Sequence, residues 1–268
     1  MQFVHQFSLV MHAGIGAVAL LLFWIPVIAR KGSLNHRRFG RYFAGAMYFV
    51  AGSGLAMAGS DLLFPLASHG IEQSVSDEVK QRLSAEIRHA ALFLFSLSIL
   101  VLASTRQGWL VILHKRDRTA LRAPAHLLLC GSLVLVGLLL LIVGTATGQP
   151  LFMGFAIVEL IVGVNLIRYA LKAELKPREW WNEHLGGLIG AGIGAYTAFF
   201  VFGGSRLLEE FLTGGFEGVM IIFWTGPGVI GGIAIALLSR HYTRRHDQRK
   251  PRVHPAIRRA GIRSKMFS

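Results

Sequence analysis

Residues 123–171, APAHLLLCGSLVLVGLLLLIVGTATGQPLFMGFAIVELIVGVNLIRYAL, contain two long apolar runs with only a few residues between them. The runs cover residues 123–146 and 150–171. Each can cross a hydrocarbon core of ~30 Å as a helix that rises ~1.5 Å per residue. The short Thr147–Pro150 connection predicts a tight antiparallel hairpin. This segment therefore predicts an all-α, polytopic membrane protein.

The rest of the chain extends this pattern. Its mean hydropathy of +0.52 and its hydrophobic content of 53% are too high for a soluble domain of 268 residues. We expect one transmembrane helical domain over residues 1–240 and a basic, disordered cytoplasmic tail over 241–268. The seven predicted spans are 7–29, 42–66, 88–105, 123–146, 150–171, 184–205 and 218–239.

Lysine and arginine are unevenly distributed between the segments that connect the spans. If connectors alternate sides, 24 of the 28 basic residues fall on one side, in 30–41, 106–122, 168–183 and 240–268. Such a bias orients helical proteins with the basic side in the cytoplasm. It predicts an outside N-terminus and an inside C-terminus in a bacterial-type inner membrane. The net charge of +14 then reflects orientation and attraction to anionic lipid headgroups, not nucleic-acid binding.

Several kinds of site are excluded or left without support. Cys130 is the single cysteine, so the chain has no intramolecular disulfide, no covalent c-type haem and no thiolate metal centre of its own. The sequence also lacks a phosphate-binding G-x-x-x-x-G-K-S/T loop and the H-E-x-x-H and G-x-S-x-G motifs. It leaves open whether the protein is an enzyme.

Histidines near the ends of the spans form two sets. His12 and His89 belong to the outer set, whereas His126 and His184 belong to the inner set, with His36 as an alternative inner ligand. Two imidazoles from different helices can bind the iron of a b-type haem. They can also hold a transition metal or relay protons. The alternative is interfacial histidines that bond to headgroups, water or helix ends.

Glu159 lies near the midpoint of the fifth predicted span. A charged carboxylate at that depth is costly, so we expect it to be neutral or to face a paired, hydrated or cofactor-lined interior. We interpret it as a proton-handling group. An interhelical hydrogen bond is the structural alternative.

The first inner connector is dense in donors. Lys31, Arg37, Arg38 and Arg41 could grip a phosphate, an anionic lipid headgroup or a carboxylate. The alternative is a positively charged turn that only fixes topology.

Three local patterns concern helix boundaries and packing. Gly186, Gly190 and Gly194, with Gly187, Ala191 and Ala195 alongside, predict close helix packing by the sixth span. Gly228 with Gly232 predicts the same for the seventh span. The polar loop 67–87 is expected to hold an external helix that begins near Ser76. Residues 107–114 either extend the third span or lie at the interface.

Two motifs carry a resemblance. His12-x-x-x-Gly16 followed by Lys31-Gly32-x-x-x-His36-Arg37-x-x-Gly40-Arg41 resembles a large family of bacterial membrane proteins known only as a domain of unknown function. The stretch from Trp181 through His184 to Phe199 is similar to a later segment of that family. The resemblance implies an inner-membrane bundle of about seven spans and singles out His12, His36 and His184. It implies no particular activity.

The favoured hypothesis is electron or proton transfer across the membrane, with b-type haem or quinone at a buried polar site. The alternatives are a small-molecule or ion transporter or channel component without a redox cofactor, and a membrane scaffold whose basic inner face binds a partner. The substrate, the oligomeric state and any partner membrane protein are left open.

Overall fold

The computed structural model describes residues 2–71, 76–204 and 216–248, which form helices and no strands. Seven of these helices are long and apolar enough to cross a membrane, which confirms the predicted fold class. They are α1 (Gln2–Ile28), α2 (Leu34–Leu63), α4 (Asp77–His114), α6 (Pro124–Thr147), α7 (Pro150–Leu171), α8 (Glu179–Ala198) and α10 (Phe216–Gln248). The short elements are α3 (Pro65–His69), α5 (Thr119–Arg122) and the π-helical turn η1 (Phe199–Gly204). The chain is a multi-pass membrane protein in contact with the lipid bilayer.

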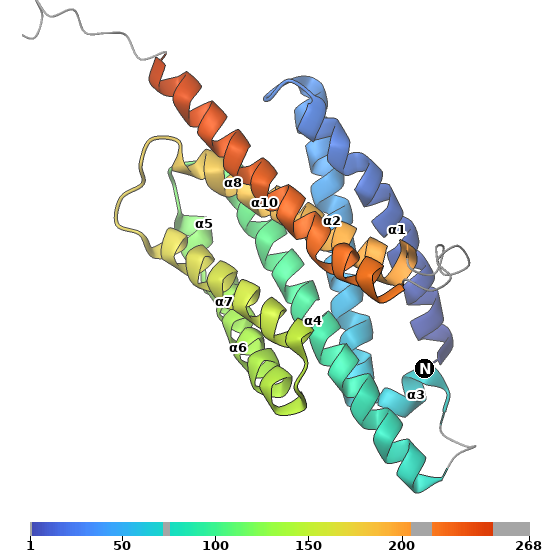
Figure 1. Cartoon of the computed structure of the whole chain (residues 1–268). Helices are drawn as coiled ribbons and strands as arrows, with labels where there is room; N and C mark the ends of the chain where they lie inside the picture. The colour runs from blue at the N-terminus through green and yellow to red at the C-terminus, as the bar shows by residue number, and fades with distance from the viewer. Residues whose placement is uncertain (1, 72–75, 205–215, 249–268) are drawn as a thin grey trace, which may run out of the picture.

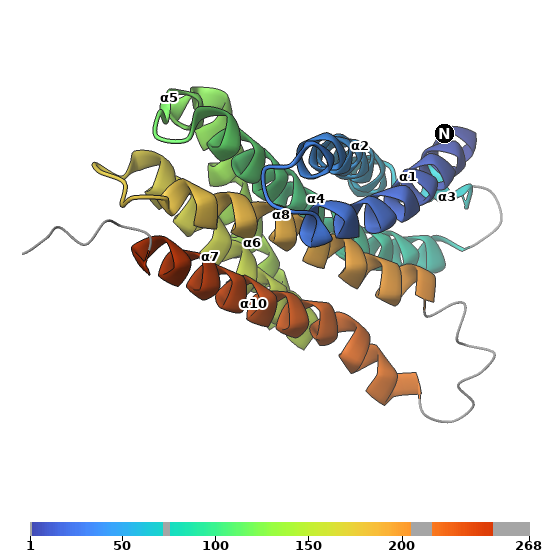
Figure 2. The same cartoon turned by 90° about the horizontal axis from the view of Figure 1, so that it is seen from above.

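Helix α4 lies at the centre of the bundle. The α1–α2 pair packs on one side of α4 and the α6–α7 hairpin on the other, while α8 crosses α4 and carries α10 on its outer face (Figures 1 and 2). Apolar clusters join α4 to each neighbouring layer, for example Val101 with Met47 and Ala191, and Ala103 with Leu133. Since α4 contacts all of these layers, its two ends are where side chains from different layers can meet.

Most predicted boundaries agree with the helices. The α6–α7 hairpin turns at Gly148 and Gln149, as the short connection predicted. Ser76 precedes α4, but the expected external helix is the first part of α4 and not a separate element. Residues 107–114 continue α4 without a break, so they extend the third span. Helix α10 runs to Gln248, beyond the predicted span end, and the rest of the predicted tail lies outside the described residues.

The closest helix crossing joins α4 and α8. A Cβ atom on Gly187 would lie 2.7 Å from the Ser104 carbonyl oxygen and 2.8 Å from the Gly108 Cα atom. The two backbones therefore touch at a point that tolerates no side chain. Small residues allow this approach in a bilayer, where packing drives helix association.

Only some of the glycines that were predicted to pack in α8 and α10 lie against a neighbouring helix. Gly194 meets Val101, whereas a Cβ atom on Gly186 or Gly190 would meet open space. In α10 the tight contact is made by Gly231 against Ile193. Gly228 and Gly232 meet no atom within 4 Å, so the predicted pair in the seventh span is wrong in register.

Connectors rich in basic residues gather at one end of the bundle, called here the loop end. Lys31 from the α1–α2 turn, Lys115 from the end of α4 and Arg178 from the α7–α8 loop line one common pocket. The opposite end, called the α3 end, holds the start of α1, α3 and the start of α4 (Figure 1). The first three basic connectors therefore lie on one side, as alternation of the spans requires.

Candidate functional site

The α1–α2 turn is built to hold His36. Gly32 adopts a left-handed conformation with φ of 80°, which glycine reaches without steric cost. The Ser33 hydroxyl oxygen then accepts a hydrogen bond from the His36 backbone N–H at 3.2 Å, which starts α2. Lys31 Nζ donates to the carbonyl oxygens of Pro26 and Val27 at 2.9 and 2.6 Å, and burial lowers the pKa of its amine. The residues that precede His36 thus fix the turn through hydrogen bonds to α1 and to the start of α2.

His36 and His184 meet at the loop end. Their ring centroids lie 6.4 Å apart, with 71° between the ring planes. His36 Nδ1 lies 2.9 Å from the Pro26 carbonyl oxygen, and His184 Nδ1 lies 2.8 Å from the Gly108 carbonyl oxygen. Because a carbonyl oxygen only accepts, each Nδ1 carries a hydrogen, and in the neutral form of each ring Nε2 is the nitrogen that can bind a metal.

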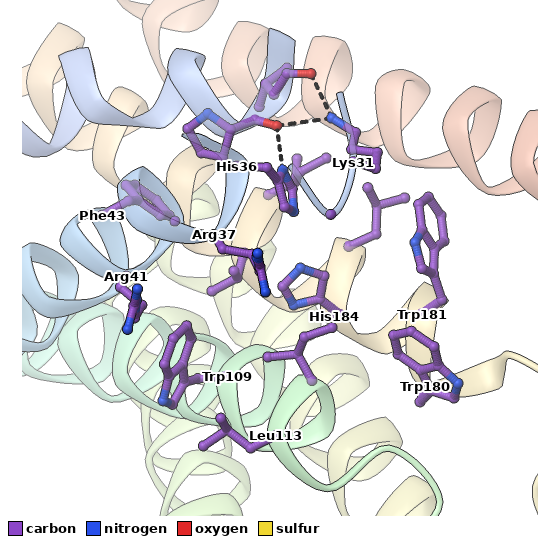
Figure 3. A pocket seen from close by; sticks show the side chains of 18 of the residues that line it. Lys31, His36, Arg37, Arg41, Phe43, Trp109, Leu113, Trp180, Trp181 and His184 are labelled. Carbon is purple, nitrogen blue, oxygen red and sulfur yellow. Dashed lines mark hydrogen bonds between the residues drawn. The ribbon is translucent and has the colours of Figure 1, made fainter. Parts of the chain in front are cut away.

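The two histidines line a pocket of about 880 Å³ (Figure 3). This volume lies within the range of about 300–1,000 Å³ typical of small-molecule sites. Its wall is largely apolar and aromatic, and it includes five basic side chains and no acidic one among the residues described. The basic residues are Lys31, Arg37, Arg41, Lys115 and Arg178, and the aromatic ones are Phe23, Phe43, Trp109, Trp180 and Trp181.

The four predicted anion-binding residues differ in position. Arg37 and Arg41 line the pocket. Lys31 also lines it but is bonded to the end of α1. Arg38 points elsewhere, because its Nε donates to the Tyr42 hydroxyl at 3.2 Å on an exposed face. Of the four predicted residues, Arg37 and Arg41 are therefore the two that line the pocket with guanidinium groups not already used in hydrogen bonds within the described chain.

His126 has a different environment from the other inner histidines. It is fully buried, and its Nε2 lies 2.8 Å from Gln107 Oε1, while Gln107 Nε2 donates to Glu183 Oε2 at 3.2 Å. This chain of polar groups joins α6, α4 and α8. The structure thus brings His184 together with His36, the predicted alternative ligand, while His126 bonds to Gln107, a residue that the sequence did not single out.

The two predicted outer histidines are not joined to each other. His12 Nδ1 lies 2.9 Å from the Ser53 hydroxyl, so it links α1 to α2. His89 lies on α4, half-buried, and makes no hydrogen bond or ring contact with another described residue.

Glu159 is fully buried between α6, α7 and α4. Its Cβ atom lies against Gly137 of the partner helix in the hairpin. Within the described chain neither carboxyl oxygen has a hydrogen-bond partner of normal geometry. Ser96 lies beside the carboxyl group, but its hydroxyl donates to the Phe93 carbonyl oxygen at 2.9 Å. No hydrogen bond of normal geometry thus joins the carboxyl group to another helix, and Ser96 of α4 is the polar group beside it.

A further polar cluster lies at the α3 end, where the sequence predicted no site. His5 of α1, Asp61 of α2 and His69 of α3 place one ligand atom each within 4.8 Å of one another. A signal for it was present, because Asp61 is an acidic residue near the end of an apolar span, and such residues are usually functional.

No family model, curated protein or solved structure matches this chain. The functional argument therefore depends on its own geometry. Fold and site together define a polytopic helical membrane protein with a basic, aromatic pocket at one end.

Proposed function

We propose that this protein is a membrane electron carrier and that His36 and His184 would hold a b-type haem in the loop-end pocket. The observation that carries the proposal is the pairing of these two rings from different helices across a pocket of suitable size and lining. A bound haem would supply one-electron redox chemistry.

The distance between the rings fits this role. Imidazole nitrogens bind metals at about 2 Å, so two rings on opposite sides of one metal have centres roughly 6 Å apart. The observed 6.4 Å agrees with that value. The angle of 71° between the planes is also compatible, because the planes of two imidazoles that would bind one metal need not be parallel.

The hydrogen bonds of the rings support the same role. A metal-bound histidine usually donates its other ring N–H to a carbonyl or carboxylate, which fixes its tautomer and orientation. His36 and His184 both have this arrangement through Pro26 and Gly108. His126 does not, because its Nε2 is bonded to Gln107 and its Nδ1 has no hydrogen-bond partner among the described residues.

The lining suits the remaining parts of the ligand. A haem has a flat apolar body and two carboxylates, and the pocket combines Trp109, Trp180 and Trp181 with the guanidinium groups of Arg37 and Arg41. Arginine binds carboxylates through paired, charge-assisted hydrogen bonds. A quinone would use the same apolar wall, but its carbonyl oxygens carry no charge to pair with the two guanidinium groups, so haem is the better fit.

The test is a spectrum of the protein purified in mild detergent after expression with an adequate haem supply. Wild type is expected to show a reducible Soret band and α-band, and His36→Ala and His184→Ala are each expected to lose them. His36→Met should keep haem and raise its reduction potential, because a methionine ligand raises the potential. His114→Ala is the matched control, since His114 is an exposed histidine at the end of α4. A colourless wild type, or haem retained in both alanine variants, would refute the proposal.

A second candidate function is favoured by Glu159. A buried carboxyl group without a hydrogen-bond partner in the described chain can take up and release a proton inside the bundle. A proton-coupled transporter without a redox cofactor would use such a group, and a colourless wild type would make this the leading function.

A further inference from the structure

We propose that His5, Asp61 and His69 form a binding site for a divalent transition-metal cation such as Zn²⁺, with one coordination position left open. The site lies at the α3 end and is separate from the loop-end pocket. Along α1, Pro26 of that pocket lies 21 positions after His5, which is about 30 Å of helix. The metal site and the haem site can therefore be tested independently.

The ligand atoms are already spaced for a metal. His5 Nε2 lies 3.2 Å from Asp61 Oδ1 and 3.3 Å from Oδ2, and His69 Nε2 lies 3.5 Å from Oδ1. A tetrahedral metal with bonds of about 2.0–2.1 Å separates its ligands by about 3.3 Å. Little rearrangement is thus needed to place a cation between the three side chains.

The environment of Asp61 favours a cation over a simple surface ion pair. Asp61 is only 9% exposed, and its Oδ1 has no hydrogen bond of normal geometry within the described chain, although both histidine nitrogens face it. A buried carboxylate oxygen without a donor is costly. A metal bound to this oxygen would offset the cost of its burial, and the two imidazoles would bind the metal in their neutral forms.

The donor set selects the class of metal. Two imidazoles and one carboxylate suit Zn²⁺ and neighbouring first-row transition metals, whereas Ca²⁺ and Mg²⁺ prefer ligands that are all oxygen. The side chain of His69 is 39% exposed, whereas His5 is only 15% exposed. The fourth position is therefore reached from the His69 side, where water or another small ligand can bind.

The fold brings the three residues together from separate elements. His5 lies in the first turns of α1, Asp61 in the last turn of α2 and His69 at the end of α3. The imidazole rings of His5 and His69 are tilted by 53° at 5.3 Å between centroids, so they converge on the carboxylate and do not stack on each other. A cation here would fasten the start of α1 to the α2–α3 corner.

The experiment uses the full chain, purified in mild detergent through an affinity tag that contains no histidine, because the chain already has 11 histidines. After treatment with a chelator, Zn²⁺ binding is measured by competition with a chromophoric chelator. Co²⁺ is added separately, because its visible absorption distinguishes a tetrahedral or five-coordinate site from an octahedral one. We expect one tight Zn²⁺ per chain and an intense Co²⁺ spectrum.

Asp61→Asn and His69→Gln remove a ligand with little change in size. Changes around a metal's ligands typically weaken binding about 10- to 100-fold, and loss of a ligand should weaken it at least as much. Zn²⁺ should also raise the melting temperature of wild type but not of either variant, because only the intact site binds it. His89→Gln is the control, since His89 is half-buried on α4 and outside the cluster.

Three results would overturn the proposal. The first is a wild type that takes up no Zn²⁺ at micromolar concentration. The second is a Co²⁺ spectrum typical of an octahedral, mostly hydrated ion. The third is equal loss of binding in His89→Gln and His69→Gln, which would place the metal elsewhere. A haem spectrum retained in Asp61→Asn would show that the two sites do not depend on each other.

Discussion

The two ends of the bundle use histidine in different settings. At the loop end, His36 and His184 face a pocket of about 880 Å³. Its described lining contains lysines and arginines but no acidic side chain. At the α3 end, His5 and His69 converge on the buried carboxylate of Asp61 within 4.8 Å. The first setting suits a large anionic ligand with an apolar body, and the second suits one small cation. The space and charge around the imidazoles, and not their presence, separate the two functions.

Basic residues on one side of the bundle also divide into two roles. Arg118 donates to the carbonyl oxygens of Tyr169, Lys172 and Ala173, and Arg122 donates to those of Ala170 and Lys172. These arginines satisfy the free carbonyl groups at the end of α7. Arg37 and Arg41 line the pocket instead. A basic connector thus serves folding at one position and ligand binding at another.

The largest expected effect concerns which face of the membrane each end occupies. We propose that the loop end lies in the cytoplasm and the α3 end outside. Reporter fusions near Ser76 should then report the outside, and fusions near Asp117, Lys176 and Lys250 the inside, each as an all-or-none signal. This result would assign the loop-end pocket to the cytoplasmic face and the cluster of His5, Asp61 and His69 to the outer face. An outside signal from Asp117 or Lys250 would reverse the assignment of the two ends.

Much of the fold could be predicted because it follows from local composition. Seven apolar runs and the alternation of basic connectors are visible in the chain without knowledge of any contact. Helix ends were less predictable, because α4 and α10 extend past the hydrocarbon length as ordinary polar helices. The resemblance to the bacterial domain of unknown function stays a prediction.

The sites could be predicted only in part, because they depend on how the helices are rotated about their axes. The sequence singled out His36 and His184, but it did not pair them, since 147 residues lie between them. It missed the metal cluster because His69 belongs to α3, a five-residue helix with no strong sequence pattern. The sequence named both Gly186 and Gly187 as small residues for close packing, but only Gly187 packs on α4, a difference of one position that span-level hydropathy cannot resolve.

A substitution at the α4–α8 crossing should affect the loop end and leave the α3 end unchanged. Gly187→Leu places a side chain where the Ser104 carbonyl oxygen and Gly108 already lie, so the helices must separate. His184 is bonded to the Gly108 carbonyl oxygen, so the pocket should lose its haem while the α3 end keeps its metal. Overpacking of this kind costs about 1–3 kcal/mol, which thermal unfolding in detergent measures.

Gly186→Leu is the matched control for this substitution. A Cβ atom at Gly186 meets open space, so this variant should unfold near the wild-type temperature and keep its haem. Equal destabilisation of the two variants would show that α8 does not approach α4 through the Gly187 face. Loss of Zn²⁺ binding in Gly187→Leu would show that the two ends are coupled through the bundle.

The smallest expected effect concerns Glu159, which lies between the two ends and belongs to neither site. Its carboxyl group is buried without a hydrogen-bond partner in the described chain, so it destabilises the folded state relative to an apolar group of the same shape. Glu159→Met, which is unbranched like glutamate, should therefore raise the free energy of unfolding by about 1 kcal/mol. Glu183 provides the comparison, because it accepts a hydrogen bond from Gln107, and Glu183→Met should lower stability by leaving that amide unpaired. Chemical unfolding of both variants in the same detergent measures the difference.

If Glu159→Met were instead destabilised as much as Glu183→Met, Glu159 would have a polar partner such as a bound water or ion. That result would favour proton- or ion-coupled transport, and Glu159→Gln should then abolish the coupled activity while the fold is retained, because an amide does not titrate.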